Sequence, residues 1–133
     1  MRDLDAVKRT LRFVAASFAG GAVAIVVVLS SVDLGEPESP DLADGGALTA
    51  AVFGVAGLLI ALQWWSRAGE QAPNPAQLQM GFIIRTAIAE LGLLLGILAL
   101  VISGSTTPMA IGLGLFLASL LLLVLALDRG VDG

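Results

Sequence analysis

The sequence predicts an all-α membrane protein: a single integral domain, residues 1–133, that forms a four-helix transmembrane bundle. The chain is 57% hydrophobic and only 14% charged, and a soluble domain of 133 residues could not enclose that much apolar surface. Apolar stretches with few or no charges, long enough for the roughly 20 residues of a membrane-crossing helix, recur along the chain. The basic residues, moreover, avoid every second connection between these stretches.

Four membrane spans are predicted, at residues 13–32, 47–65, 80–103 and 109–127. The first could be mistaken for a signal peptide, but it exceeds the usual apolar core of about 7–15 residues, and we expect an uncleaved helix. Asn74 and Pro75 read as the N-cap and first residue of a helix that begins before the third span. Gly104 is expected to end that helix.

The connection between the first two spans, residues 33–46, is an acidic loop in which Pro37 and Pro40 rule out a regular helix. It lacks the ligand spacing and the glycine of a calcium-binding EF-hand loop, so no metal site is predicted. Trp64 and Trp65 close the second span, where tryptophan side chains anchor helices at the headgroup level.

The distribution of Lys and Arg predicts the orientation of the chain. Four of the seven basic residues precede the first span, and the other three are Arg67, Arg85 and Arg129. The acidic loop and residues 103–108 contain none, so both termini are expected in the cytoplasm and the acidic loop outside. The expected location is therefore the cell membrane.

Small residues at four-residue spacing mark the expected contacts between helices, because they let helix backbones approach closely in lipid. Every predicted span carries such a stripe, including Ala16–Gly20–Ala24 in the first and Ala110–Gly114–Ala118 in the fourth. The packing glycines predicted from these stripes are Gly20, Gly54, Gly92, Gly96 and Gly114.

Glu90 is the only acidic residue inside a predicted span, near the middle of the third. A charge there costs at least about 2.5–3.5 kcal/mol on insertion scales, which makes Glu90 the candidate for a proton or ion site. Thr86, one turn earlier, is its nearest expected hydrogen-bonding neighbour. Arg85 lies about 140° away around the helix, on the small-residue side, and is expected to reach the cytoplasmic headgroups as an interface anchor.

The segment 73–102 resembles the outer helix of the c-subunit, or proteolipid, of rotary ATP synthases. Pro73-Asn74-Pro75 stands in the preceding loop, Ala87-Ile88-Ala89-Glu90 surrounds the carboxyl group, and Gly96 follows six positions on. The resemblance implies an oligomeric ring in which Glu90 would carry a proton or sodium ion. The whole chain also resembles small four-span prokaryotic membrane proteins with an acidic residue in the third span, a likeness that implies no particular activity.

The composition argues against several classes of function. The chain has no histidine and no cysteine, so a catalytic base, a thiol nucleophile and the commonest metal ligands are absent, and we predict neither an enzyme nor a cofactor. The formal charge of −4 disfavours nucleic acid as a partner. The expected partners are the lipid bilayer and a homo-oligomer or larger membrane complex. The favoured role is an accessory or assembly subunit; the alternatives are a proton- or cation-handling oligomer that uses Glu90 and a minimal small-solute transporter.

Overall fold

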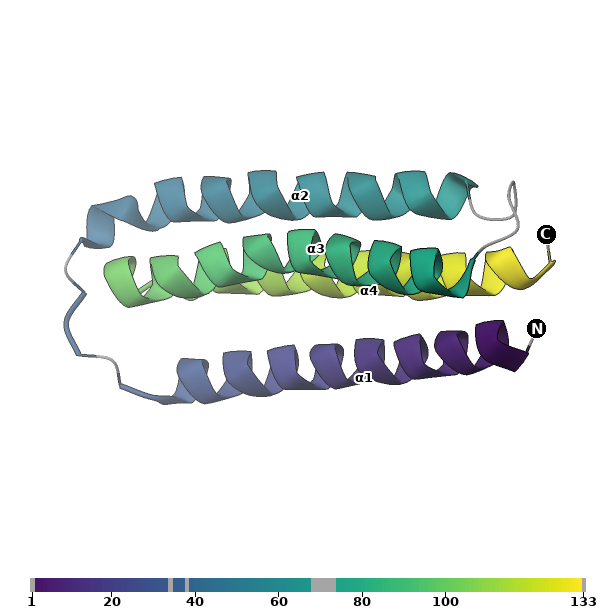
Figure 1. Ribbon diagram of the computed structural model, residues 1–133. Helices are drawn as coiled ribbons and strands as arrows, with labels where there is room; N and C mark the ends of the chain where they lie inside the picture. Colours follow the sequence, from purple (N-terminus) through teal and green to yellow (C-terminus); the bar gives the residue numbers. More distant parts are fainter. Residues whose placement is uncertain (1, 34, 38, 68–73, 133) are drawn as a thin grey trace.

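The computed structural model is built from four long helices (Figure 1). It describes residues 2–33, 35–37, 39–67 and 74–132, and the side chains among them except those of residues 2, 3 and 128–132. Each helix is long and apolar enough to cross a membrane, so the predicted all-α fold with four membrane-spanning helices is confirmed. The elements are α1 (Arg2–Ser31), the short 3-10 turn η1 (Pro40–Leu42), α2 (Ala43–Arg67), α3 (Pro75–Ser103) and α4 (Thr107–Asp132).

The helices extend beyond the predicted spans at several ends. α1 begins at Arg2 rather than near Phe13, and α2 begins at Ala43, directly after η1. The predicted spans marked only the apolar part of each helix, whereas Lys and Arg are good helix formers and continue α1 outside the hydrocarbon. The connection between α2 and α3 falls mainly on residues 68–73, outside the described residues.

Both ends of α3 are fixed by local sequence, as predicted. The Asn74 side chain accepts a hydrogen bond from the backbone N–H of Ala76 at 2.9 Å, and Pro75 occupies the first turn. At the other end Gly104 adopts φ 75°, a left-handed conformation that glycine enters without the steric cost of a Cβ. Its N–H donates to the Leu100 carbonyl at 2.8 Å, which ends the helix.

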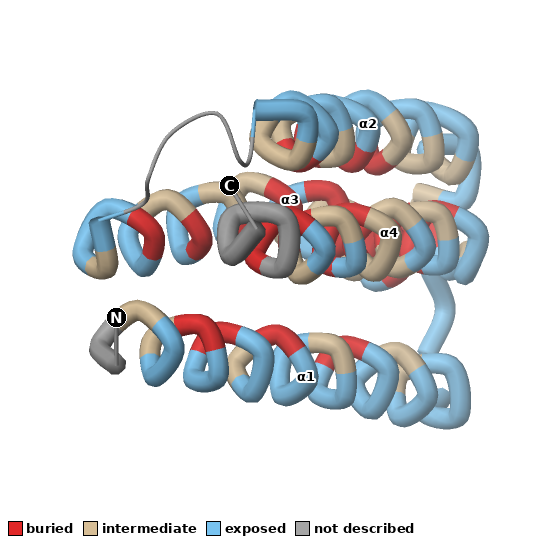
Figure 2. Tube along the Cα trace, turned by 90° about the vertical axis from the view of Figure 1, so that its right-hand side faces the viewer, coloured by how far each residue is buried: buried red, intermediate tan, exposed pale blue. Residues whose placement is uncertain are grey.

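The helices form a diamond rather than a closed square. α3 and α4 lie side by side in the middle, α2 packs on one side of this pair, and α1 packs on the opposite side (Figures 1 and 2). Within the described residues α1 and α2 do not touch each other. The two chain ends lie at the same end of the molecule, as an even number of crossings requires (Figure 1).

The acidic connection passes over the far end of α3. The backbone N–H of Ser39 donates to the carbonyl of Ile102 at 2.9 Å, so it pairs one of the carbonyl groups that the last turn of a helix leaves open. Pro37 lies so close to Gly104 that a Cβ there would approach the proline ring carbons to 3.0–3.1 Å. This loop therefore holds α1 and α2 apart, on opposite sides of the α3–α4 pair.

Candidate functional site

Glycines bring α2, α3 and α4 into backbone contact at the centre of the molecule. A Cβ at Gly92 would lie 2.8 Å from both the Cα and the N of Gly54, and one at Gly96 would lie 2.5 Å from the carbonyl oxygen of Pro108. Gly54 is itself covered by the Leu115 side chain. Three of the five predicted packing glycines therefore lie where two helices meet.

Gly20 and Gly114 do not lie at contacts between helices of this chain, which corrects the prediction for them. No heavy atom would come within 4 Å of a Cβ added at either position, and both residues are exposed. α1 instead packs through its opposite face, which includes Leu11 and Ala15. The Ala16–Gly20–Ala24 stripe is exposed along its whole length.

One further glycine of the predicted stripes, Gly57 (spaced four residues from Ala61), also packs against another helix, whereas Gly112 and Lys8 take packing positions that the sequence analysis missed. A Cβ at Gly112 would lie 2.5 Å from the Gly92 carbonyl oxygen, and one at Gly57 would lie 2.7 Å from the Cα of Ala89. Gly112 follows Pro108 and precedes Phe116 at four-residue spacing, a signal present in the sequence but overlooked beside Gly114. Lys8 is only 2% exposed, and it shares helical spacing with Leu4, Leu11 and Ala15.

Arg85 of α3 and Trp64 of α2 form a cation–π interaction. The guanidinium carbon lies 4.8 Å from the centre of the Trp64 ring, and the Trp64 and Phe82 rings are 6.3 Å apart at 59°. Arg85 Nη1 also donates to the Gly81 carbonyl at 3.1 Å, back toward the start of α3. Arg85 therefore projects on the side of Gly92 and away from Glu90, as helical geometry predicts. Trp65 is partly buried.

Glu90 lies at the border between the buried and the outer surface of α3. It is half-buried, whereas Thr86 and Leu93 on the same side are buried and Ile83 and Leu94 are exposed. Within the described part of the chain no hydrogen bond or ion pair to Glu90 is found, and no group of three or more acidic side chains could hold a metal ion. The carboxyl group therefore sits at an edge where a second molecule could reach it.

Thr86 carries a buried hydroxyl group one turn from Glu90. It is 3% exposed, and its Oγ1 has no hydrogen-bond partner among the described residues. The other buried hydroxyls are satisfied by their own helices: Ser103 donates to Ala99 at 2.6 Å and Ser119 to Leu115 at 2.8 Å. Thr86 is thus the one described buried hydroxyl available to a neighbouring carboxyl or a bound ion.

Replacing this hydroxyl by a methyl group is expected to stabilise the protein. Thr86→Val keeps the shape of the side chain and removes an unsatisfied buried polar group, so the free energy of unfolding should rise by about 1 kcal/mol. Ser119→Ala is the control, because it removes a hydroxyl that has a partner and should not stabilise. Reversible unfolding in mixed detergent micelles measures both variants; equal destabilisation by the two would contradict the assignment.

Comparison of the chain with protein-family models, with curated proteins and with solved structures finds no match. The class of protein therefore rests on the fold and composition. Four apolar helices of membrane-crossing length, most of whose outward side chains are hydrophobic, define a small multi-pass α-helical membrane protein.

Proposed function

We propose that this protein is an accessory or assembly subunit of a membrane complex, and that Glu90 binds a partner helix from another chain or another copy of this one. The observation that carries the proposal is the position of Glu90 within the span, half-buried at the edge of α3 and without a partner in the described chain. A polar group in hydrocarbon is costly unless it is paired, so a hydrogen bond from a neighbouring transmembrane helix would stabilise the complex.

The outer small-residue stripes support the same proposal. Gly54 and Gly57 of α2 and Gly92 and Gly96 of α3 lie against a neighbouring helix, whereas Gly20 on α1 and Gly114 on α4 face outward with open space around them. Such positions permit close approach of another helix in lipid.

The proposed setting is the cell membrane, with both termini in the cytoplasm and the loop before α2 outside. The seven basic residues support this orientation, since none lies in the two connections at the opposite end of the helices.

A second candidate function is proton or cation handling by Glu90. The unpartnered hydroxyl of Thr86, one turn away and buried, favours this candidate because it could donate to the carboxylate or contribute an oxygen to a bound ion. The resemblance of residues 73–102 to the proteolipid helix belongs to this candidate. A proteolipid-like role would require many copies of the chain assembled in a ring.

Two substitutions at Glu90 separate these functions. If Glu90 mediates assembly, Glu90→Gln keeps a hydrogen-bonding group and preserves the complex, whereas Glu90→Leu weakens association by about 5- to 30-fold, the equivalent of roughly 1–2 kcal/mol. Native mass measurement in mild detergent reports both. Ile84→Ala is the matched control, since Ile84 is 49% exposed on the other outward side of α3. Equal assembly of wild type and Glu90→Leu would refute the assembly role.

If Glu90 carries an ion, Glu90→Gln should abolish proton or sodium flux into vesicles that contain the purified protein, while assembly stays intact. Unchanged flux in this variant would remove the second candidate. A monomer or dimer by native mass would exclude a proteolipid-like ring.

A further inference from the structure

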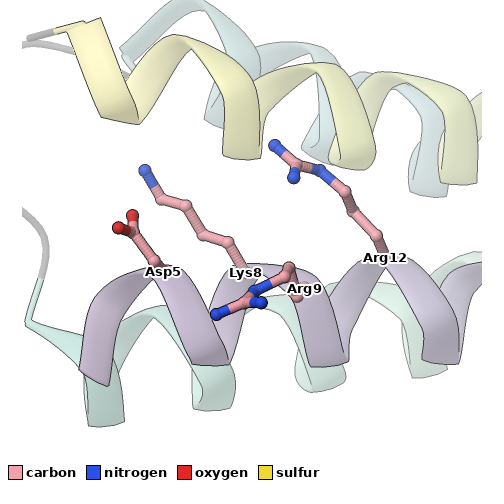
Figure 3. A pocket seen from close by; sticks show the side chains of 4 residues that line it. All are labelled: Asp5, Lys8, Arg9 and Arg12. Carbon is pink, nitrogen blue, oxygen red and sulfur yellow. The ribbon is translucent and has the colours of Figure 1, made fainter. Parts of the chain in front are cut away.

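α1 is the helix least covered by the rest of the described chain. It packs on α3 and α4 through one face, and a smaller share of its most apolar stretch is buried than in any other helix. At its start this inner face is already occupied. Figure 3 shows Lys8 and Arg12 extending from α1 toward α4, and both interact with other groups of the chain. A further partner of α1 would therefore have to bind the opposite side of the helix.

The opposite side of α1 carries a second set of residues at the spacing used for helix pairing. Seven exposed residues follow one another at alternating three- and four-residue intervals, the heptad repeat by which two helices pack along a left-handed seam. They lie about 180° around the helix axis from the buried residues Lys8, Leu11 and Ala15. We call this set the outer seam: Thr10, Phe13, Ser17, Gly20, Ala24, Val27 and Ser31.

The central turns of the outer seam carry small side chains. Ser17, Gly20 and Ala24 are all exposed, and a Cβ at Gly20 would meet nothing within 4 Å. The central part of α2 instead exposes large apolar side chains, such as Phe53 and Leu59. Small residues let the backbone of a second helix approach closely in lipid. The outer seam is therefore shaped to receive another helix.

Ser17 adds an unpaired hydroxyl group to the outer seam, inside the hydrocarbon. It lies four residues, or about 6 Å, beyond Phe13, where the apolar stretch begins. The other two hydroxyl groups of the seam, on Thr10 and Ser31, donate to backbone carbonyls of their own helix at 3.0 and 2.8 Å. Ser17 makes no hydrogen bond within the described residues. Because water does not reach this depth, its natural partner is a polar group on another helix.

We propose that the outer seam of α1 binds the same seam of a second copy of this chain, so that two α1 helices pair in parallel. Copies inserted with the same orientation can pair about a twofold axis along the membrane normal, which places each seam residue opposite its own counterpart. Gly20 then meets Gly20, and Ser17 meets Ser17, whose hydroxyl group both donates and accepts. No residue of the seam is charged, so no like charges meet along it. The inference goes beyond the role proposed for Glu90, which lies on α3.

The test is disulfide cross-linking in native membranes, which is open because the chain has no cysteine of its own. Oxidation should link Ser17→Cys, Gly20→Cys and Ala24→Cys each into a covalent dimer, since parallel pairing brings equal positions together. Ile25→Cys is the matched control. It lies beside Ala24 at nearly the same depth, is 51% exposed and points about 100° further around the helix, so it should remain monomeric. Equal cross-linking at positions 24 and 25 would indicate random collision and would overturn the proposal. Absence of dimer at all three seam positions would also overturn it, because another occupant would then cover the seam.

A second set of variants tests the same interface without cysteine. Gly20→Leu fills the seam but meets no other part of the chain, so it should weaken dimerisation in mild detergent by about tenfold. Ser17→Ala should weaken it by about threefold, the usual effect of losing one hydrogen bond in a membrane. Gly114→Leu is the control, since Gly114 has equally open space but lies on α4. Loss of the dimer in Gly114→Leu and not in Gly20→Leu would place the interface on α4 and overturn the proposal.

The role of Glu90 is separated from this interface by combining Ala24→Cys with Glu90→Leu. The cross-link through α1 should survive the loss of the carboxyl group, whether or not Glu90 mediates assembly. Disappearance of the cross-link in this double variant would show that the dimer is held at α3 and would overturn the assignment to α1.

Discussion

Gly92→Ala should destabilise the protein by about 1–3 kcal/mol, although alanine is the better helix former. The added methyl group would meet the Gly54 backbone at 2.8 Å and the Ala50 carbonyl oxygen at 3.1 Å. Backbone atoms cannot relieve the clash by changing rotamer as a side chain can, so α2 and α3 would have to move apart. The separation would also loosen α4, because Gly112 rests on the carbonyl of the same residue, Gly92.

Gly114→Ala supplies the matched control and should have the opposite sign. Within a single copy the same methyl group meets nothing within 4 Å there, so in the dissociated monomer only the lower chain entropy of alanine counts, and the monomer should gain about 0.5–1 kcal/mol. Unfolding of both variants in mixed micelles, followed by circular dichroism, measures the difference. Equal stability changes in the two variants would show that the contact at Gly92 is not tight.

Cysteine labelling should show an all-or-none difference between the two ends of α2. The natural chain has no cysteine, so Asp41→Cys and Ser66→Cys each introduce a single reactive thiol. Both positions are exposed, one on each side of the apolar part of α2. With both termini in the cytoplasm, a membrane-impermeant maleimide added to intact cells should label Asp41→Cys and leave Ser66→Cys unlabelled.

Opening the cells with detergent should make Ser66→Cys react as fully as Asp41→Cys, which controls for the intrinsic reactivity of the two thiols. The reverse pattern in intact cells would place the basic end of the molecule outside. It would refute the orientation predicted from the lysines and arginines, while leaving the four-helix fold untouched.

The features that could be predicted correctly from the sequence depend on neighbouring residues along the chain. Membrane-crossing length follows from composition alone, and both ends of α3 follow from a side-chain cap at Asn74 and a left-handed glycine at Gly104. The direction of Arg85 follows from helical periodicity, which places it over the Trp64 side of α3.

The packing positions, the burial of Lys8 and the surroundings of Glu90 could not be predicted from the sequence, because they depend on which helices pack against each other. Each span offers small residues on some face, so spacing cannot distinguish Gly112, which touches α3, from Gly114, which faces outward. The charge rule interprets Lys8 as a marker of topology, and it contains no information on burial. Glu90 was recognised by its rarity in a span, but its place at the edge of α3 depends on how the other helices surround it.

The separation of α1 from α2 bears on how the chain is made in the cell. These two helices leave the ribosome before α3 and α4, yet within the described structure neither touches the other, and among the helices each has its neighbours only in α3 and α4. A nascent chain that has been synthesised only as far as Arg67 therefore contains two helices that do not pack against each other in the final structure. Assembly has to await the second half of the chain, and until then both helices are open to capture by insertion factors or to degradation by membrane proteases.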